Sequence, residues 1–243
     1  MADDVAAKAR RRLVLALDVD DLDQARRIAA SCAPWFATVK VGLELYVAAG
    51  PRAVEALRDD GFAVFVDLKL HDIPTTVRRA AAAIAKLGVA YATVHTQGGE
   101  SMLEAAAAGF AEGSATAGST IGLGVTALTS ENADAPVVAE SAEKAKKAGL
   151  GGVVCGVGDL SAVRAKAPGL ITVVPGIRPK GAGQEDQRRV GTPAAAIRGG
   201  ADLLVVGRVV TRDDDPARAA EAIAAEIAQA TKTEILVDEG APR

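Results

Sequence analysis

Charged residues at the end of one apolar run are the most informative feature of the sequence. In the segment 65–77, FVDLKLHDIPTTV, Asp67 and Lys69 are separated by one residue, and Asp72 follows shortly after them. Side chains of a β-strand alternate between its two faces, so Asp67 and Lys69 should point the same way. A neighbouring carboxylate keeps a lysine protonated, and a protonated lysine can act as a general acid. The segment therefore predicts proton-transfer chemistry.

Lys40 stands near the end of a second β-branched run and is expected to join this group. Lys40, Asp67, Lys69 and Asp72 would then form an array of alternating charge in which each group favours the ionised form of its neighbours. The alternative is a buried salt bridge with a purely structural role. We favour the catalytic interpretation, because a buried ion pair is often no more stabilising than apolar packing.

The elements that must position these residues follow a repeating pattern. Eight short β-branched runs alternate with Ala-rich segments in which apolar residues recur at helical spacing, which is typical of βα units on a parallel sheet. The predicted strands are 13–18, 37–42, 63–69, 90–95, 119–126, 151–155, 170–175 and 202–207. The predicted helices are 21–33, 51–60, 75–87, 100–109, 137–148, 159–166, 193–198 and 216–230.

The position of the polar residues distinguishes a closed barrel from an open sheet. Asp18, Lys40, Asp67 with Lys69, and His95 stand at the ends of the first four predicted strands. In a barrel these ends meet on one rim, where barrel active sites lie. We therefore predict a single (β/α)8 TIM barrel over residues 1–243, with flexible ends at 1–11 and 231–243.

Glycine-rich segments with arginines follow the last two predicted strands. Gly176 and Gly181 bracket a basic loop, and Gly207-Arg208 ends strand eight. Loops after strands seven and eight of a barrel commonly bind phosphate through backbone N–H groups and guanidinium groups. The long polar stretch 177–188 is expected to be a mobile lid over that phosphate.

Composition excludes several other classes of protein. The formal net charge is −3, with 28 basic and 31 acidic residues in mixed order, so no surface for a nucleic-acid polymer is expected. No run reaches roughly 18 apolar residues, so no membrane partner is expected. The two cysteines read as buried reduced thiols, which predicts a cytoplasmic protein. With two histidines and no Cys/His cluster at ligand spacing, a dedicated zinc site is not predicted.

The ordered motifs together resemble the orotidine 5′-monophosphate decarboxylase family. The resemblance covers nearly the whole chain, and the third segment carries most of it. The matching segments are LALDVD (15–20), TVKVG (38–42), DLKLHDIPTTV (67–77), TVHTQGG (93–99), GVTALTS (124–130), VPGIRPKG (174–181), EDQRR (185–189) and VVGRVVT (205–211).

The resemblance implies a cofactor-free decarboxylation of orotidine 5′-monophosphate to uridine 5′-monophosphate in de novo pyrimidine biosynthesis. Lys69 then protonates C6 of the pyrimidine, and Asp67 lies close to the substrate carboxylate. Lys40 completes the charged array, and Asp72 reaches into the site of the neighbouring subunit, which implies a homodimer. The substrate-binding residues implied are Asp18, Ile73, Thr76, Thr129, Arg178, Gln187, Gly207 and Arg208. Thr75 departs from the asparagine expected there, which puts one loop contact in doubt.

Two other functions fit parts of the pattern. A metal-assisted sugar-phosphate decarboxylase or aldolase of the same barrel superfamily shares the Asp-x-Lys-x-x-Asp spacing at 67–72, and it would need magnesium. A non-catalytic barrel that binds a pyrimidine nucleotide would bind its ligand without turnover. The continuation IPTTV and the segments VTALTS, GIRPKG and EDQRR favour the nucleotide decarboxylase.

Overall fold

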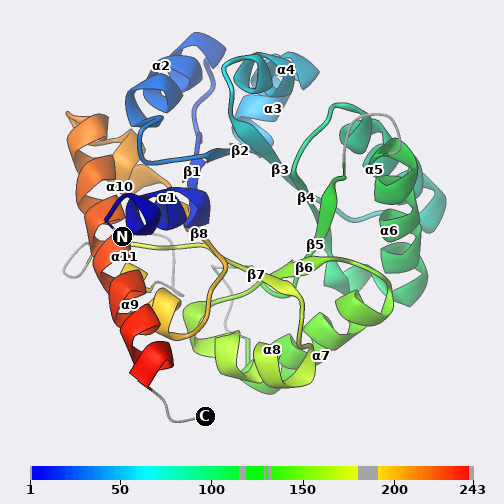
Figure 1. Cartoon of the computed structure of the whole chain (residues 1–243). Coiled ribbons are helices and arrows are strands. Elements are labelled where there is room, and N and C mark those ends of the chain that lie inside the picture. The colour runs from blue at the N-terminus through cyan, green and yellow to red at the C-terminus, as the bar shows by residue number, and fades with distance from the viewer. Residues whose placement is uncertain (1, 115–118, 129, 131–132, 180–190, 241–243) are drawn as a thin grey trace.

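Eight parallel strands close into a barrel surrounded by helices in the computed structural model, which describes residues 2–114, 119–128, 130, 133–179 and 191–240 (Figure 1). The predicted (β/α)8 barrel is confirmed. Each strand pairs with its sequence neighbours, and β1 pairs with β8 to close the sheet. The strands are β1 Leu13–Ala16, β2 Thr38–Gly42, β3 Ala63–Leu70, β4 Tyr91–His95, β5 Ile121–Val125, β6 Gly152–Val154, β7 Ile171–Val174 and β8 Leu203–Val206.

All eight predicted helices are present, and all but the last lie within about five residues of their expected limits. The amphipathic spacing gives each one an apolar face for the barrel. The final predicted helix starts at Pro216, where the Asp215 side chain accepts a hydrogen bond from the Arg218 N–H at 3.0 Å. The helices matching predictions are α2 Leu22–Cys32, α4 Pro51–Asp59, α5 Pro74–Lys86, α6 Glu100–Ser114, α7 Ala135–Lys147, α8 Leu160–Lys166, α9 Pro193–Arg198 and α11 Pro216–Gly240.

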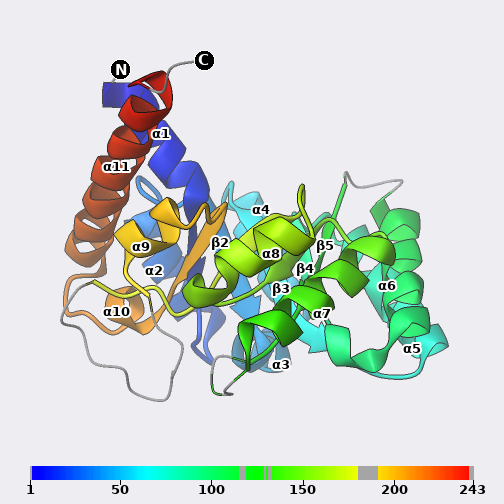
Figure 2. The same cartoon turned by 90° about the horizontal axis from the view of Figure 1, so that it is seen from below.

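Three helices were not predicted: α1 Ala2–Arg12, α3 Leu43–Ala49 and α10 Arg208–Thr211. Helix α1 lies against α11, Ala9 is buried, and the Arg10 side chain donates to the Ala33 carbonyl at 3.1 Å (Figure 2). Helix α11 continues to Gly240, past the predicted limit at 230. The contact of α1 with α11 joins residues far apart in the sequence, which local patterns do not reveal. The flexibility of the two ends stays a prediction.

Alternating side chains separate an inner core from an outer one. Val14, Phe65, Leu123, Val173 and Val205 belong to a cluster inside the barrel, whereas the residues between them on the strands pack against the helices. Aliphatic side chains dominate both clusters, as expected for a chain with only 3% aromatic residues. Because Phe65 faces inward, Asp67 at the same phase of β3 is directed into the barrel.

A polar cluster ties strands β7 and β8 together near their N-terminal ends. The Asp202 carboxylate accepts hydrogen bonds from the Thr172 N–H at 2.7 Å, from the Thr172 hydroxyl at 3.0 Å and from Arg164 at 2.8 Å. This end of a barrel contributes to stability, whereas catalytic residues occupy the opposite end. The cluster therefore stabilises the barrel away from the rim predicted to carry chemistry.

Helices α5 and α6 approach closely because glycines of α6 face α5. A Cβ added at Gly109 would collide with the Arg78 carbonyl, and one added at Gly113 would collide with the Ala82 carbonyl. Backbone atoms cannot yield as a flexible side chain can. This packing fixes α5, whose first residue, Pro74, follows the predicted site residues Asp72 and Ile73.

We expect Gly109→Ala and Gly113→Ala each to lower the free energy of unfolding by about 1–3 kcal/mol, since overpacking outweighs the better helix propensity of alanine. Urea denaturation measures this effect. Gly158→Ala is the control, because a Cβ there has no neighbour within 4 Å. Either α6 variant matching the wild type in stability would contradict this account of the packing.

Candidate active site

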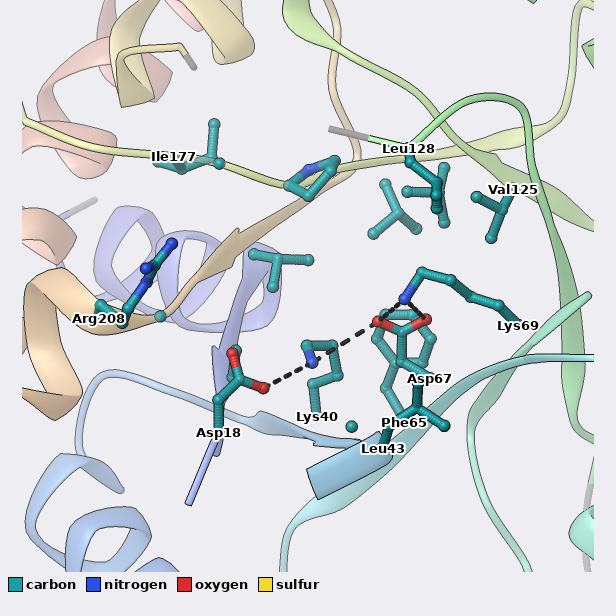
Figure 3. Close-up of a pocket in the computed structure, with 18 of the residues that line it drawn as sticks. Asp18, Lys40, Leu43, Phe65, Asp67, Lys69, Val125, Leu128, Ile177 and Arg208 are labelled. Carbon is teal, nitrogen blue, oxygen red and sulfur yellow. Dashed lines mark hydrogen bonds and ion pairs between the residues drawn. The ribbon is translucent and has the colours of Figure 1, made fainter. Parts of the chain in front are cut away.

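A cavity of about 470 Å³ opens among the C-terminal ends of the strands, within the size range of small-molecule sites. It is lined by residues from several strand ends and the loops after them (Figure 3). The fold thus brings together residues that are far apart in the sequence. The predicted site residues that line the cavity are Asp18, Lys40, Asp67, Lys69, Arg178, Gly207 and Arg208.

Four of these side chains form a chain of alternating charge. Lys69 Nζ lies 3.0 Å from both Asp67 carboxylate oxygens, and Lys40 Nζ lies 3.6 Å from Asp67 Oδ2. Lys40 Nζ also donates to Asp18 Oδ1 at 3.1 Å, as the dashed lines of Figure 3 show. Asp18 therefore occupies the fourth place in the array, which the sequence prediction assigned to Asp72.

The electrostatic environment keeps the centre of this array ionised. Burial acts to raise the pKa of Asp67, but the charges of Lys40 and Lys69 and hydrogen bonds from Lys69 and Thr93 bring it below its ordinary value. Burial acts to lower the pKa of Lys40, but Asp67 and Asp18 raise it above its ordinary value. Lys40 is therefore an ammonium and Asp67 a carboxylate at neutral pH, although their side chains are only 11% and 14% exposed.

The backbone at Lys69 departs from regular strand geometry. Its φ is 53°, and no other non-glycine residue among those described has a positive φ. Strand β3 is also out of step with β4 here, since Val66 pairs with Ala92 and Leu70 pairs with Val94. A left-handed conformation costs a non-glycine residue roughly 1–2 kcal/mol, and such strain concentrates at functional sites. Asp67 and Lys69 do meet as predicted, but an irregular strand rather than simple alternation brings them together.

Thr93 is a site residue that the sequence analysis missed. Its hydroxyl accepts a hydrogen bond from the Lys69 N–H at 2.9 Å and donates one to Asp67 Oδ1 at 3.0 Å. A threonine in a strand is ordinarily a strand former, so its type gave no signal. Its position could have revealed it, because Thr93 lies on β4, next to the strand that carries Asp67, and its side chain points into the barrel.

The two ends of the cavity differ in character. Arg208 lies beyond Asp18 at the end away from Lys69, whereas Val125 and Leu128 lie near Lys69 (Figure 3). Arg178, which is 7% exposed, and Arg212 also line the cavity, and Arg212 was not predicted. The arrangement suits an elongated ligand with an anionic group at one end and a polar ring at the other.

Three predicted residues lie away from this cavity in their own chain. Asp72, Ile73 and Thr76 occupy the exposed turn and first residues of α5, and Asp72 Oδ1 accepts a hydrogen bond from the Ile73 N–H at 2.6 Å. Thr129 and Gln187 fall outside the described residues, as does most of the predicted lid at 177–188.

Comparisons with known proteins agree with the geometry. Residues 11–223 match the family model described as the orotidine 5′-phosphate decarboxylase / HUMPS family. The chain belongs to this family. It is 47% identical over 231 residues to the orotidine 5′-phosphate decarboxylase of Halorhodospira halophila, covering 90% of this chain and 97% of the relative. The resemblance inferred from the sequence motifs is thus confirmed.

A second relative and a solved structure show the same similarity. The orotidine 5′-phosphate decarboxylase of Moorella thermoacetica is 44% identical, over 90% of this chain and 93% of the relative. The crystal structure of the Lactobacillus acidophilus orotidine 5′-phosphate decarboxylase superposes with a TM-score of 0.77 at 35% identity, covering 89% of this chain and 99% of that one. The solved structure therefore shares the fold of this chain over nearly its whole length.

The described part of the chain offers neither a metal-binding cluster nor a membrane-spanning helix. No group of three or more His, Cys, Asp or Glu side chains within them is arranged to hold a metal ion. No described helix is long and apolar enough to cross a membrane.

The depressed pKa of Asp67 predicts a pH-dependent contribution to stability. Such a group stabilises the fold fully above its unfolded pKa of about 3.9, and the contribution is lost as the pH falls through the folded pKa. We expect the difference in unfolding free energy between wild type and Asp67→Asn to shift against the wild type between pH 7 and pH 3. Urea titrations at a series of pH values measure it, and a difference that is constant or shifts the other way would contradict the inferred ionisation.

Proposed function

We propose that this chain decarboxylates orotidine 5′-monophosphate to uridine 5′-monophosphate in de novo pyrimidine biosynthesis, without a metal or other cofactor. The observation that carries the proposal is an ammonium, Lys69, held by two 3.0 Å contacts to Asp67 inside a cavity whose far end carries Arg208. Membership of the family and the names of relatives up to 47% identical support the same substrate.

The polarity of the cavity orients the substrate. The phosphate dianion binds at the end lined by Arg178 and Arg208, where guanidinium groups offer paired donors. Asp18 and Lys40 lie between that end and Lys69, and they hydrogen-bond the ribose hydroxyls. The pyrimidine then lies at the other end with C6 towards Lys69. Thr129 and Gln187 are proposed to bind the pyrimidine edge and the phosphate, and Ile73, Thr76 and Gly207 to border the ligand.

Lys69 completes the reaction as the proton donor. The bond between C6 and the carboxylate carbon breaks, carbon dioxide leaves, and the electron pair stays on C6. The Lys69 ammonium transfers a proton to C6, and the resulting amine regains a proton from solvent. Asp67 holds Lys69 through both carboxylate oxygens, so little reorganisation is needed as the charge on C6 develops.

The energetic demand explains the size of the site. The electron pair left on C6 lies in the ring plane, where the π system stabilises it poorly, so the uncatalysed barrier is high. Enzymes lower barriers by about 8–23 kcal/mol, and this reaction needs the upper part of that range. Contacts to phosphate and ribose supply binding energy remote from the breaking bond, while Val125 and Leu128 help to exclude water near Lys69.

The first experiment follows the loss of the orotate absorbance when purified protein is mixed with orotidine 5′-monophosphate in excess EDTA. Rapid conversion to uridine 5′-monophosphate is the expected result. A metal-assisted sugar-phosphate decarboxylase or aldolase of the same superfamily would instead require magnesium and act on sugar phosphates, and a non-catalytic nucleotide-binding barrel would bind without turnover. Either outcome with folded protein would refute the proposal.

Variants at the two ends of the cavity should fail in different ways. Lys69→Ala is expected to lower kcat by more than about 10³-fold, because it removes both the proton donor and a preorganised charge. Arg208→Ala is expected mainly to raise KM through weaker phosphate binding. Steady-state kinetics separate the two effects, and a Lys69→Ala enzyme of near-normal rate would rule out the proposed proton donor.

We further propose a homodimer in which Asp72 enters the neighbouring active site. The residues that follow the adjacent strands β2 and β3 expose apolar side chains on one rim, with Leu43 57%, Val47 82% and Ile73 66% exposed. Asp72 stands beside them and does not line the cavity of its own chain. Burying such a patch against its symmetry mate would cover the apolar surface and bring Asp72 to the neighbouring cavity as a further carboxylate.

Subunit mixing tests the shared site. Lys69→Ala and Asp72→Ala proteins should each be nearly inactive, because one lacks the proton donor and the other the carboxylate given to its neighbour. Random reassortment gives heterodimers with one intact site each, so the mixture should recover about a quarter of wild-type activity. No recovery despite demonstrated exchange of subunits would contradict the assignment of Asp72.

The state of the cysteines supports the cytoplasmic location predicted from the sequence. Cys32 and Cys155 are both buried, and neither forms a disulfide. Buried thiols outside disulfides are typical of proteins in reducing compartments, where disulfides are rare.

A further inference from the structure

We infer that Thr93 is a positioning residue for the decarboxylation, whose hydroxyl holds Lys69 and Asp67 in their reactive arrangement. The inference rests on the proposed function. Thr93 does not line the cavity, so it acts through the two charged residues rather than on the substrate.

The direction of both hydrogen bonds is determined by chemistry. An ionised carboxylate can only accept and a backbone N–H can only donate, whereas a hydroxyl does each once. Thr93 Oγ1 therefore donates to Asp67 Oδ1 at 3.0 Å and accepts from the Lys69 N–H at 2.9 Å. One side chain thus links the backbone of the proton donor to the carboxylate that orients its ammonium.

The irregular backbone at Lys69 explains why a side chain is needed here. The β3–β4 pairing passes from Val66 with Ala92 to Leu70 with Val94, so Lys69 lies where the ladder is interrupted. A partly buried N–H that loses its ladder partner needs another acceptor, and the Thr93 hydroxyl takes the place of a ladder carbonyl. Thr93 therefore stabilises the conformation at φ 53° that brings the Lys69 side chain back over Asp67.

Thr93 is also a rigid support for Asp67. It lies within β4, pairs in register with Leu123 of β5 and is 1% exposed. Its β-branched side chain has restricted rotation. Among the described residues, the other groups bonded to the Asp67 carboxylate are ammoniums at the ends of long lysine side chains. Thr93 is thus the partner best able to fix the position of the carboxylate.

The test compares Thr93→Val with Thr93→Ser. Thr93→Val keeps the shape but removes the hydroxyl, so kcat for orotidine 5′-monophosphate should fall about 10- to 100-fold, the effect of losing one hydrogen bond to a charged group. KM should change less than about threefold, because the phosphate and ribose contacts lie elsewhere in the cavity. Thr93→Ser keeps the hydroxyl and should restore kcat to within about threefold of the wild type.

Thr172→Val is the matched control. Thr172 is also buried and also donates to an aspartate at 3.0 Å, but it lies near the opposite end of the barrel. The Thr172→Val protein should be less stable than the wild type but should keep the wild-type kcat. A Thr172→Val enzyme as slow as Thr93→Val would show that general loosening of the barrel explains the effect, and would overturn the inference.

Amide hydrogen exchange at Lys69 gives a second measurement that does not depend on activity. Exchange should be faster in Thr93→Val than in wild type and unchanged in Thr93→Ser. Wild-type kcat in Thr93→Val, or equal loss of kcat in the serine variant, would overturn the inference. Thr93→Ala replaces the valine variant if the latter does not fold, with the same expected outcomes. Failure of the wild-type enzyme to convert orotidine 5′-monophosphate would instead refute the proposed function, and Lys69 exchange would still decide the role of Thr93.

Discussion

The buried carboxylate of Asp67 is the constraint on which the rest of the site depends. A charge removed from water is tolerated only when opposite charges and hydrogen bonds replace the lost solvent. Lys69, Lys40 and Thr93 supply that replacement from three adjacent strands, and Asp18 balances Lys40 from the loop after β1. The contacts that keep each group ionised also hold its neighbour in position. The array is therefore preorganised before any substrate binds.

The barrel separates stability from chemistry along its axis. Near the N-terminal ends of the strands, Asp202 links Thr172 and Arg164 in a cluster that ties β7 to β8. Around the middle, aliphatic side chains fill the inner core. The opposite end can then accommodate backbone strain, such as the left-handed conformation of Lys69. The packing in the rest of the barrel offsets the free energy that this strain costs.

The cavity also separates binding from reaction. Arg208 lies at the end suited to phosphate, and Lys69 lies at the other end beside apolar residues. Binding energy gained at the first end can position the ring at the second, where a lower effective dielectric strengthens the interaction of Lys69 with the developing charge. In the proposed dimer, the exposed apolar residues beside Asp72 would be buried and Asp72 would reach the neighbouring cavity.

The sequence by itself determined the eight βα units, the closed barrel and most charged residues of the site, because hydrophobic periodicity and strand-end polarity are local signals. It also placed Lys69, Asp67 and Lys40 together, since the ends of parallel strands converge in a barrel. Only the tertiary structure revealed Asp18 as the fourth member of the charge chain, the irregular strand at Lys69 and the role of Thr93. It also revealed helix α1, whose packing on α11 joins the two ends of the chain. Those features depend on contacts between residues distant in sequence, and the type of a single residue does not encode which partner the fold will bring to it.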